Sequence, residues 1–172
     1  MRKHILGITG VLSIAFCLTI TSFKSGEKKQ VQPAIIETVD DIYASHIISL
    51  YNDTHLAEVG LSLPVFEKAL TGFYNLKKSG QLADKSILTI ADFDQASTKK
   101  RVYIIDLEQK KILLNTWVAH GQNTGADEAV KFSNKNDSFT SSLGFYVTGE
   151  IYRGVHGRSL RLDGMDLGFN DN

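Results

Sequence analysis

The chain has 172 residues, which is enough for one domain with a hydrophobic core and for little more. Its 42% hydrophobic and 22% charged residues are typical of a globular protein and exclude a largely disordered chain. The formal net charge is zero, so nucleic acid is not expected as the main partner, because phosphate binding needs a basic surface.

The first 23 residues have the pattern of an export signal. Arg2 and Lys3 precede a mostly apolar run over residues 5–23, and a polar stretch follows it. This order is typical of a secretory signal peptide, while the length of the run also allows an uncleaved membrane anchor. We therefore expect export to the periplasm or cell envelope, with membrane contact only through this segment if it stays uncleaved.

Cys17 is the one cysteine in the 172 residues, and it lies inside the apolar run. Acylation of Cys17, as in a lipoprotein, is one interpretation, although the bulky Phe16 stands where a small residue is expected. In either case residues 24–172 contain no thiol. We expect neither a disulfide nor a cysteine nucleophile in that part of the chain.

A linker and a first helix are predicted after the signal. Residues 24–39 are polar and contain Pro33, which indicates a linker. From Asp40 onward apolar residues recur at steps of three and four, which is typical of one helix face, and Asp40 or Asp41 is the predicted cap. The members of this stripe are Ile42, Tyr43, His46, Ile47, Leu50 and Tyr51.

A second helix is marked more clearly by its ends. Ser62 is the predicted cap, Pro64 belongs to the first turn, and Gly80 is the predicted stop. We expect the helical region to span residues 40–85 and to pack against a sheet that begins at about residue 86.

Three strands are predicted next, because apolar and β-branched residues alternate there with a period of two. They cover residues 86–93, 101–107 and 111–119, and the polar linker 108–110 is short enough for an antiparallel hairpin. The predicted fold class is therefore α+β, with N-terminal helices packed on a mostly antiparallel sheet.

The last third of the chain alternates between loops and strands. A loop rich in Asn, Asp, Gly and Ser is predicted over residues 122–138, and strands are predicted over 141–148, 151–155 and 159–162. Residues 163–172 form a predicted turn-rich loop without a closing element. Because an unpaired sheet edge invites aggregation, we expect the β domain to be C-terminally incomplete.

Two histidine–glycine pairs are candidates for chemistry. His120-Gly121 and His156-Gly157 each combine an imidazole with a residue that permits close backbone approach. A catalytic or ligand-contacting histidine is one interpretation, and a hydrogen-bonded histidine near a turn is the favoured one. No metal site is expected, because the histidines lack the spacing of a two-histidine ligand motif.

Other polar residues have simpler explanations. Ser141 and Ser142 lack a neighbouring base or a G-x-S-x-G elbow, so loop hydroxyls are favoured over nucleophiles. The acidic and amide residues of the tail lack the register of a calcium loop, and turn formation explains them. These tail residues are Asp163, Asp166, Asn170 and Asp171.

The blocks of this sequence resemble a known family in their order and spacing. They are ADFDQASTKKRVYIIDLEQKKILLNTWVAHGQNTG, then FSN, SSLGFYVTGEIYRGVHGRSLRLDG and GFNDN. Together they resemble the murein L,D-transpeptidase catalytic-domain family, in the exported branch of Bacteroidetes-type bacteria. The resemblance covers residues 88–172, and the helical stretch before it looks like an N-terminal extension.

The resemblance implies an enzyme of peptidoglycan. A cysteine thiolate attacks a carbonyl of a stem peptide, forms a thioester and passes the acyl group to an amine on another stem. A histidine takes the thiol proton, and backbone amides stabilise the oxyanion. No cofactor is implied, and the expected partner is the peptidoglycan stem peptide.

Carried over by position, the resemblance implies framework residues only. Residues 118–121 look like the family's V-x-x-G block, and residues 142–146 look like its T-P-x-G-x-F block without the proline. The implied substrate-cleft framework is His120, Gly121, Ser142, Gly144 and Tyr146. The family's catalytic histidine and cysteine blocks would lie beyond Asn172, so no catalytic residue is assigned.

Two interpretations follow for function. The 172 residues are an incomplete copy of an L,D-transpeptidase, inactive as written, with residues 86–172 as a partial β domain. Alternatively, the chain is a non-catalytic exported protein associated with the cell wall.

Overall fold

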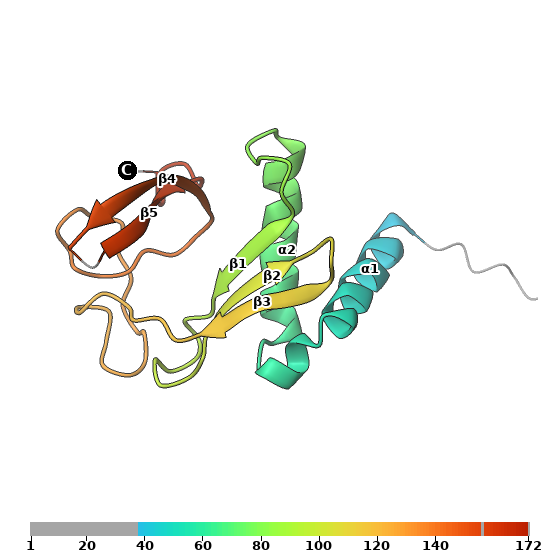
Figure 1. Ribbon diagram of the computed structural model, residues 1–172, viewed down its shortest axis with the longest axis horizontal. Helices are drawn as coiled ribbons and strands as arrows, with labels where there is room; N and C mark the ends of the chain where they lie inside the picture. Colours follow the sequence, from blue (N-terminus) through green and yellow to red (C-terminus); the bar gives the residue numbers. More distant parts are fainter. Residues whose placement is uncertain (1–37, 156, 172) are drawn as a thin grey trace, which may run out of the picture. The chain divides into compact units, whose positions relative to one another are not determined.

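The computed structural model describes residues 38–155 and 157–171 (Figure 1). Helices α1 (Val39–Asp53) and α2 (Leu63–Lys78) are joined through the 3-10 helix η1 (Leu56–Val59). The strands are β1 (Ile87–Ala91), β2 (Val102–Asp106), β3 (Lys111–Thr116), β4 (Tyr146–Gly154) and β5 (Gly157–Gly164). They form two antiparallel sheets, β1–β2–β3 and β4–β5. The predicted α+β class is confirmed.

Several predicted features lie outside the described residues. They are the signal over residues 1–23 with Cys17, most of the linker over 24–39, and His156. Among the helices that the structure does describe, none combines the length and the apolar content that crossing a membrane requires.

Helix α1 begins at Val39, slightly earlier than predicted. Thr38 is the N-cap: its Oγ1 accepts a hydrogen bond from the Asp41 backbone N at 3.1 Å. The Asp41 carboxylate accepts in return from the Thr38 backbone N at 3.0 Å, which completes a capping box. The prediction that Asp40 or Asp41 caps this helix was therefore wrong. The hydrogen bonds from the Thr38 side chain and backbone lower the pKa of Asp41.

Helix α2 begins and ends where its sequence predicts. Ser62 occupies the N-cap position, although its hydroxyl makes no capping hydrogen bond. At the other end Gly80 adopts φ +74°, and its N–H donates to Lys77 O at 3.1 Å while Gln81 N donates to Leu76 O at 3.0 Å. These two bonds are a Schellman motif, for which glycine is the favoured residue.

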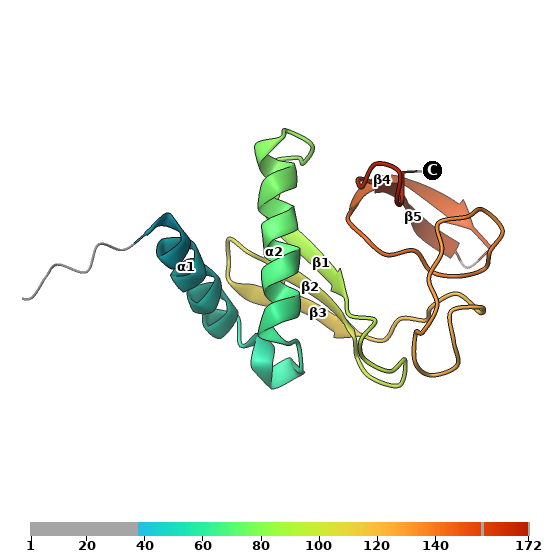
Figure 2. The same cartoon turned by 180° about the vertical axis from the view of Figure 1, so that it is seen from behind.

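Helix α2 lies across one face of the β1–β2–β3 sheet, as the two opposite views show (Figures 1 and 2). In the sheet, Leu88 of β1 pairs with Ile105 of β2, and Ile90 pairs with Tyr103, so the four side chains share a face. The main core residues are Phe66, Leu70 and Phe73 from α2, and Leu88, Ile90, Tyr103 and Ile105 from the sheet. The predicted packing of helix on sheet is confirmed.

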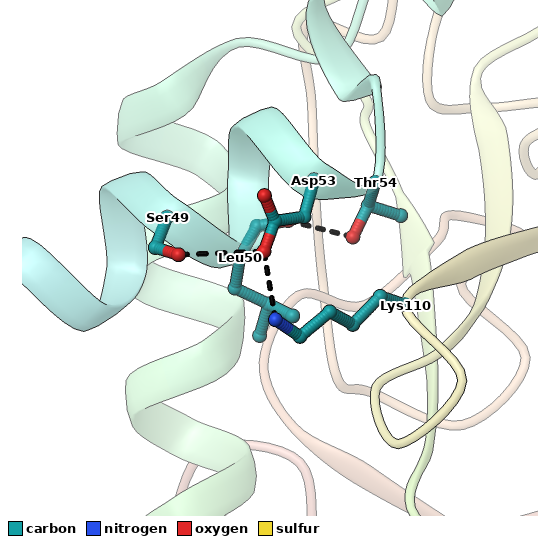
Figure 3. Close-up of polar contacts among 5 residues, drawn as sticks. All are labelled: Ser49, Leu50, Asp53, Thr54 and Lys110. Carbon is teal, nitrogen blue, oxygen red and sulfur yellow. Dashed lines mark hydrogen bonds and ion pairs between the residues drawn. The ribbon is translucent and has the colours of Figure 1, made fainter.

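The β2–β3 hairpin is also tied to helix α1. Asp106 Oδ1 accepts from the backbone N of Glu108 and Gln109, at 3.0 and 2.8 Å, and this closes the turn. Figure 3 shows the next turn residue, Lys110, with its Nζ 2.7 Å from Asp53 Oδ2 at the end of α1. The hydrogen bond and charge of Lys110 lower the pKa of Asp53.

The strand predicted over residues 141–148 begins five residues later than expected, at Tyr146. The backbone donors before it are engaged elsewhere: Ser141 N donates to Thr124 Oγ1, and Phe145 N donates to Asp166 Oδ2. Gly144 also adopts φ +117°, which an extended strand does not accommodate. Residues 141–145 are therefore a loop, and the period of two in this segment was misleading.

Candidate functional site

Arg101 is the residue around which distant segments of the chain meet. It immediately precedes β2, and none of its surface is exposed. Its Nη2 donates to His120 Nδ1 at 2.8 Å and to Val118 O at 3.1 Å, and its Nη1 donates to Gln95 O at 2.8 Å. One guanidinium therefore fixes the loop after β1 and the segment after β3, because its donors have a rigid planar geometry.

The surroundings of the Arg101 guanidinium are mostly uncharged. Its central carbon lies 4.9 Å from the ring centre of Phe93, and no carboxylate of the described residues is close enough for an ion pair with it. Burial lowers the pKa of Arg101, while the charge of nearby Asp92 acts in the opposite direction. A buried cation that depends on carbonyl and imidazole acceptors is costly to place, so its partners are held firmly.

The hydrogen bonds of His120 define its tautomer. His120 Nε2 lies 2.9 Å from Ala126 O and 3.3 Å from Gly125 O, and a carbonyl can only accept. Nε2 therefore carries the proton, and Nδ1 accepts from Arg101. Because both ring nitrogens are engaged within the protein, the geometry favours a structural histidine near a turn over a proton acceptor for a substrate.

Gly121 brings the first framework segment against the second. Its N–H donates to Ser141 Oγ at 3.0 Å, and a Cβ added at this position would lie 2.5 Å from Phe139 O. The fully buried Thr124 strengthens the contact: its Oγ1 accepts from Ser141 N at 2.7 Å, and its own N–H donates to Gly121 O at 2.8 Å. The close backbone approach explains why glycine is needed here.

The remaining framework residues follow directly along the chain. Ser142 Oγ lies 3.2 Å from Asn134 Oδ1, which connects it to the loop after residue 132. Tyr146 opens β4 and pairs with Gly164 of β5. A Cβ at Gly144 would overlap the side chains of Asn170 and Asp166.

The C-terminal turn fixes the second framework segment. Asn170 is 3% exposed, and its Nδ2 donates to Phe145 O at 3.0 Å and Leu143 O at 3.2 Å. Asp166 Oδ2 accepts from Phe145 N at 2.7 Å. The carboxylate and the amide of the tail therefore close a turn around residues 143–145. Among the described residues no group of three acidic, histidine or cysteine side chains could hold a metal ion.

Sequence reasoning missed Arg101 and Thr124, and it assigned Asn170 to a turn without predicting its burial. Arg101 could have been found, because it has the same parity as Tyr103, Ile105 and Leu107 and hence faces inward. Thr124 and Asn170 belong to loops, where no periodicity marks a buried side chain.

The arrangement positions two loop segments without presenting a nucleophile. Among the described residues there is no cysteine, and the hydroxyls of Ser141 and Ser142 are partly buried and hydrogen-bonded. Exposed apolar side chains lie beside them, with Phe139 at 61% and Leu143 at 40%.

The fold and this site define a class of protein. An antiparallel sheet is covered by a helix, and the loops that follow the sheet need glycine where backbone segments approach closely. A family model described as the L,D-transpeptidase catalytic domain matches residues 57–172, more than half of the chain, and the chain belongs to this family. The suspected resemblance is confirmed, and the match begins upstream of residue 88, so that it includes α2. No curated protein and no solved structure matches the chain. Family membership supports a function connected with peptidoglycan.

Proposed function

We propose that the chain binds peptidoglycan stem peptides in the cell envelope, as the substrate-binding part of an L,D-transpeptidase catalytic domain. The observation that carries this proposal is the family match over residues 57–172. The proposed binding surface is the framework of His120, Gly121, Ser142, Gly144 and Tyr146. The contact of Gly121 with Ser141 and Thr124 supports this location, because it joins the two framework segments.

Binding and acyl transfer have different requirements in this family. Thioester chemistry needs a cysteine thiolate, and the one cysteine of the 172 residues is Cys17, within the apolar N-terminal run. We therefore propose that the 172-residue chain binds stem peptides without transferring acyl groups.

A pull-down assay with insoluble peptidoglycan tests the binding proposal. The purified 172-residue chain is mixed with intact peptidoglycan and, in parallel, with peptidoglycan whose stems have been removed by an amidase. We expect saturable binding to the intact polymer and measurably weaker binding to the stripped polymer, which keeps the glycan strands but has lost the stems. Equal binding to both, or no binding by a chain whose circular dichroism shows it folded, would overturn the proposal.

A second candidate is a protein that associates with the cell wall and is not part of any acyl-transferring enzyme, and the absence of a thiol from residues 24–172 favours it. Two measurements distinguish the candidates. They are the sequence of the encoding locus past codon 172 and the intact mass of the native protein. A continuation that contains the histidine and cysteine blocks supports the transpeptidase. A stop codon with a matching mass supports the non-catalytic protein.

A further inference from the structure

Trp117 is a large aromatic residue held at the surface. Its side chain follows β3 and is 58% exposed, yet its Nε1 donates to Thr98 O at 3.2 Å. The Lys100 ammonium lies 4.9 Å from the ring centre and further limits its movement. Tryptophan gains much free energy from burial, and exposed tryptophans of fixed orientation are typical anchors of binding sites.

An open hollow of about 730 Å³ is lined in part by Lys100. This lysine connects the hollow with Trp117, since it also contacts the indole. The hollow is lined on one side by η1 and the residues around it, and on the other by the loop before β2 and by β3. Its polar lining residues are Glu58, Gln95, Lys99, Lys100 and Asn115. The amides of Gln95 and Asn115 already donate within the protein, so the two lysines are the cationic groups of this lining that a polar ligand can bind.

The charge of the hollow favours an anionic ligand. Neither Lys99 nor Lys100 belongs to an ion pair among the described residues. The one carboxylate at the rim, Glu58, already accepts a hydrogen bond from His55 Nδ1 at 2.9 Å. Two ammonium groups are therefore available to carboxylates, with which they form charge-assisted hydrogen bonds.

We propose that Trp117, Lys99 and Lys100 form a subsite for the glycan strand of peptidoglycan, an inference that rests on the proposed function. A sugar ring packs its C–H face on the exposed indole, and the two lysines bind the lactyl carboxylates of sugars that carry no stem peptide, since a stem converts this carboxylate into an amide. The position of Trp117 is close to the proposed stem-binding framework. Its neighbour Val118 accepts a hydrogen bond from Arg101, which also donates to His120 of the framework. Stem peptide and glycan are covalently joined, so neighbouring surfaces of one protein can bind both.

Intrinsic fluorescence tests this subsite directly, because Trp117 is the one tryptophan of the chain. The 172-residue chain is titrated with peptide-free glycan strands, whose sugars carry free carboxylates, and with uncharged oligomers of N-acetylglucosamine. We expect a saturable change in emission with both, and at least about fivefold tighter binding of the carboxylated strands, reduced by salt. Unchanged emission with the glycan strands would overturn the proposal.

Substitutions test whether Trp117, Lys99 and Lys100 are the residues that bind the glycan. Calorimetry of Trp117→Leu is expected to show at least about tenfold weaker binding of glycan strands, because the aromatic anchor is lost. The double variant K99Q/K100Q is expected to bind carboxylated and uncharged glycans equally. Lys85→Gln, which changes an exposed lysine outside the hollow, is the matched control and is expected to bind like the unmodified chain. Loss of glycan binding in the control, or none in Trp117→Leu, would contradict the assignment.

The two proposals can fail separately. Binding to intact peptidoglycan without any change in Trp117 emission would overturn the glycan subsite and leave stem-peptide binding in place. Binding of peptide-free glycan, combined with equal binding to intact and stripped polymer, would overturn stem-peptide recognition and leave the subsite.

Discussion

Arg101 holds its neighbours through hydrogen bonds to neutral acceptors. Replacing it with leucine leaves the partly buried acceptors Val118 O, Gln95 O and His120 Nδ1 without their donor. Each buried acceptor left unpaired costs about 1–3 kcal/mol, so we expect Arg101→Leu to lower the free energy of unfolding by at least about 2 kcal/mol. Urea denaturation followed by circular dichroism measures this change.

The matched control for that prediction is Arg161→Leu. Arg161 is exposed, and its guanidinium lies 5.3 Å from the ring centre of Tyr152. We expect this change to alter the free energy of unfolding by less than about 0.5 kcal/mol. Similar effects of the two substitutions would show that the Arg101 hydrogen bonds do not stabilise the fold.

A second prediction for a single residue concerns Gly121. A methyl group at residue 121 would lie 2.5 Å from Phe139 O and 2.8 Å from the Thr140 carbonyl carbon, both of which are backbone atoms. We expect Gly121→Ala to lower the free energy of unfolding by about 1–3 kcal/mol and to weaken binding to peptidoglycan. In Gly154→Ala the new methyl group would meet only side chains, so the loss is expected to stay below about 1 kcal/mol. Unfolding curves that rank the two variants in the opposite order would contradict this.

Individual residues differ in how far the sequence reveals them. The buried position of Arg101 follows from its parity with β2, and Gly80 is marked by the end of an apolar stripe. The burial of Asn170 and Thr124 has no such mark, because their partners are backbone groups brought close only by the folded loops. The framework residues come from the family resemblance and remain predictions about binding.

The Asp53–Lys110 contact joins helix α1 to the β2–β3 turn, and its effect depends on pH. Lys110 lowers the pKa of Asp53 in the folded state below its unfolded value of about 3.9. The resulting stabilisation is complete above that unfolded value and is lost as pH falls through the folded pKa. We expect Lys110→Met to be less stable than the unmodified chain at pH 7, with the difference shrinking below about pH 4.

Urea denaturation at pH 7 and at pH 2.5 measures the free energy of unfolding of the unmodified chain and of Lys110→Met. Both side chains are about half exposed, with values of 53% and 44%, so added salt is expected to reduce the difference at pH 7. A difference of equal size at the two pH values would show that the carboxylate of Asp53 is not its source.

Helices and strands are predicted well from the sequence where a single hydrophobic periodicity is accompanied by residues that mark both ends. Helix α2 has a cap, a proline in the first turn and a terminal glycine, and its bounds agree with them. The loop over 141–145 shows the opposite case, because side chains from Thr124 and Asp166 take the backbone donors that a strand would use. Such long-range competition cannot be seen in a local pattern.

The two sheets are expected to differ in local stability. Strand β2 pairs on both sides and contributes Tyr103 and Ile105 to the core. The β4–β5 hairpin has two strands, and several of its apolar side chains are exposed, for example Ile151 at 56% and Leu162 at 60%. We expect amide hydrogens of β2 to exchange at least about tenfold more slowly than those of β4 and β5. Hydrogen–deuterium exchange with mass spectrometry tests this order, and equal protection of both sheets would refute it.

The contact between Gly72 and Phe145 bears on where this protein can be divided. The ring of Phe145 lies so close to Gly72 that a Cβ on the glycine would overlap it. The loop that opens β4 therefore takes part of its shape from helix α2, some seventy residues earlier in the chain. A shortened chain that starts at residue 86 would lack the helix surface against which the Phe145 ring packs. It would also expose the apolar sheet face that Phe66 and Leu70 cover. Helix α2 therefore contributes to the shape of both sheets' surroundings, and we expect a unit that folds on its own to include it.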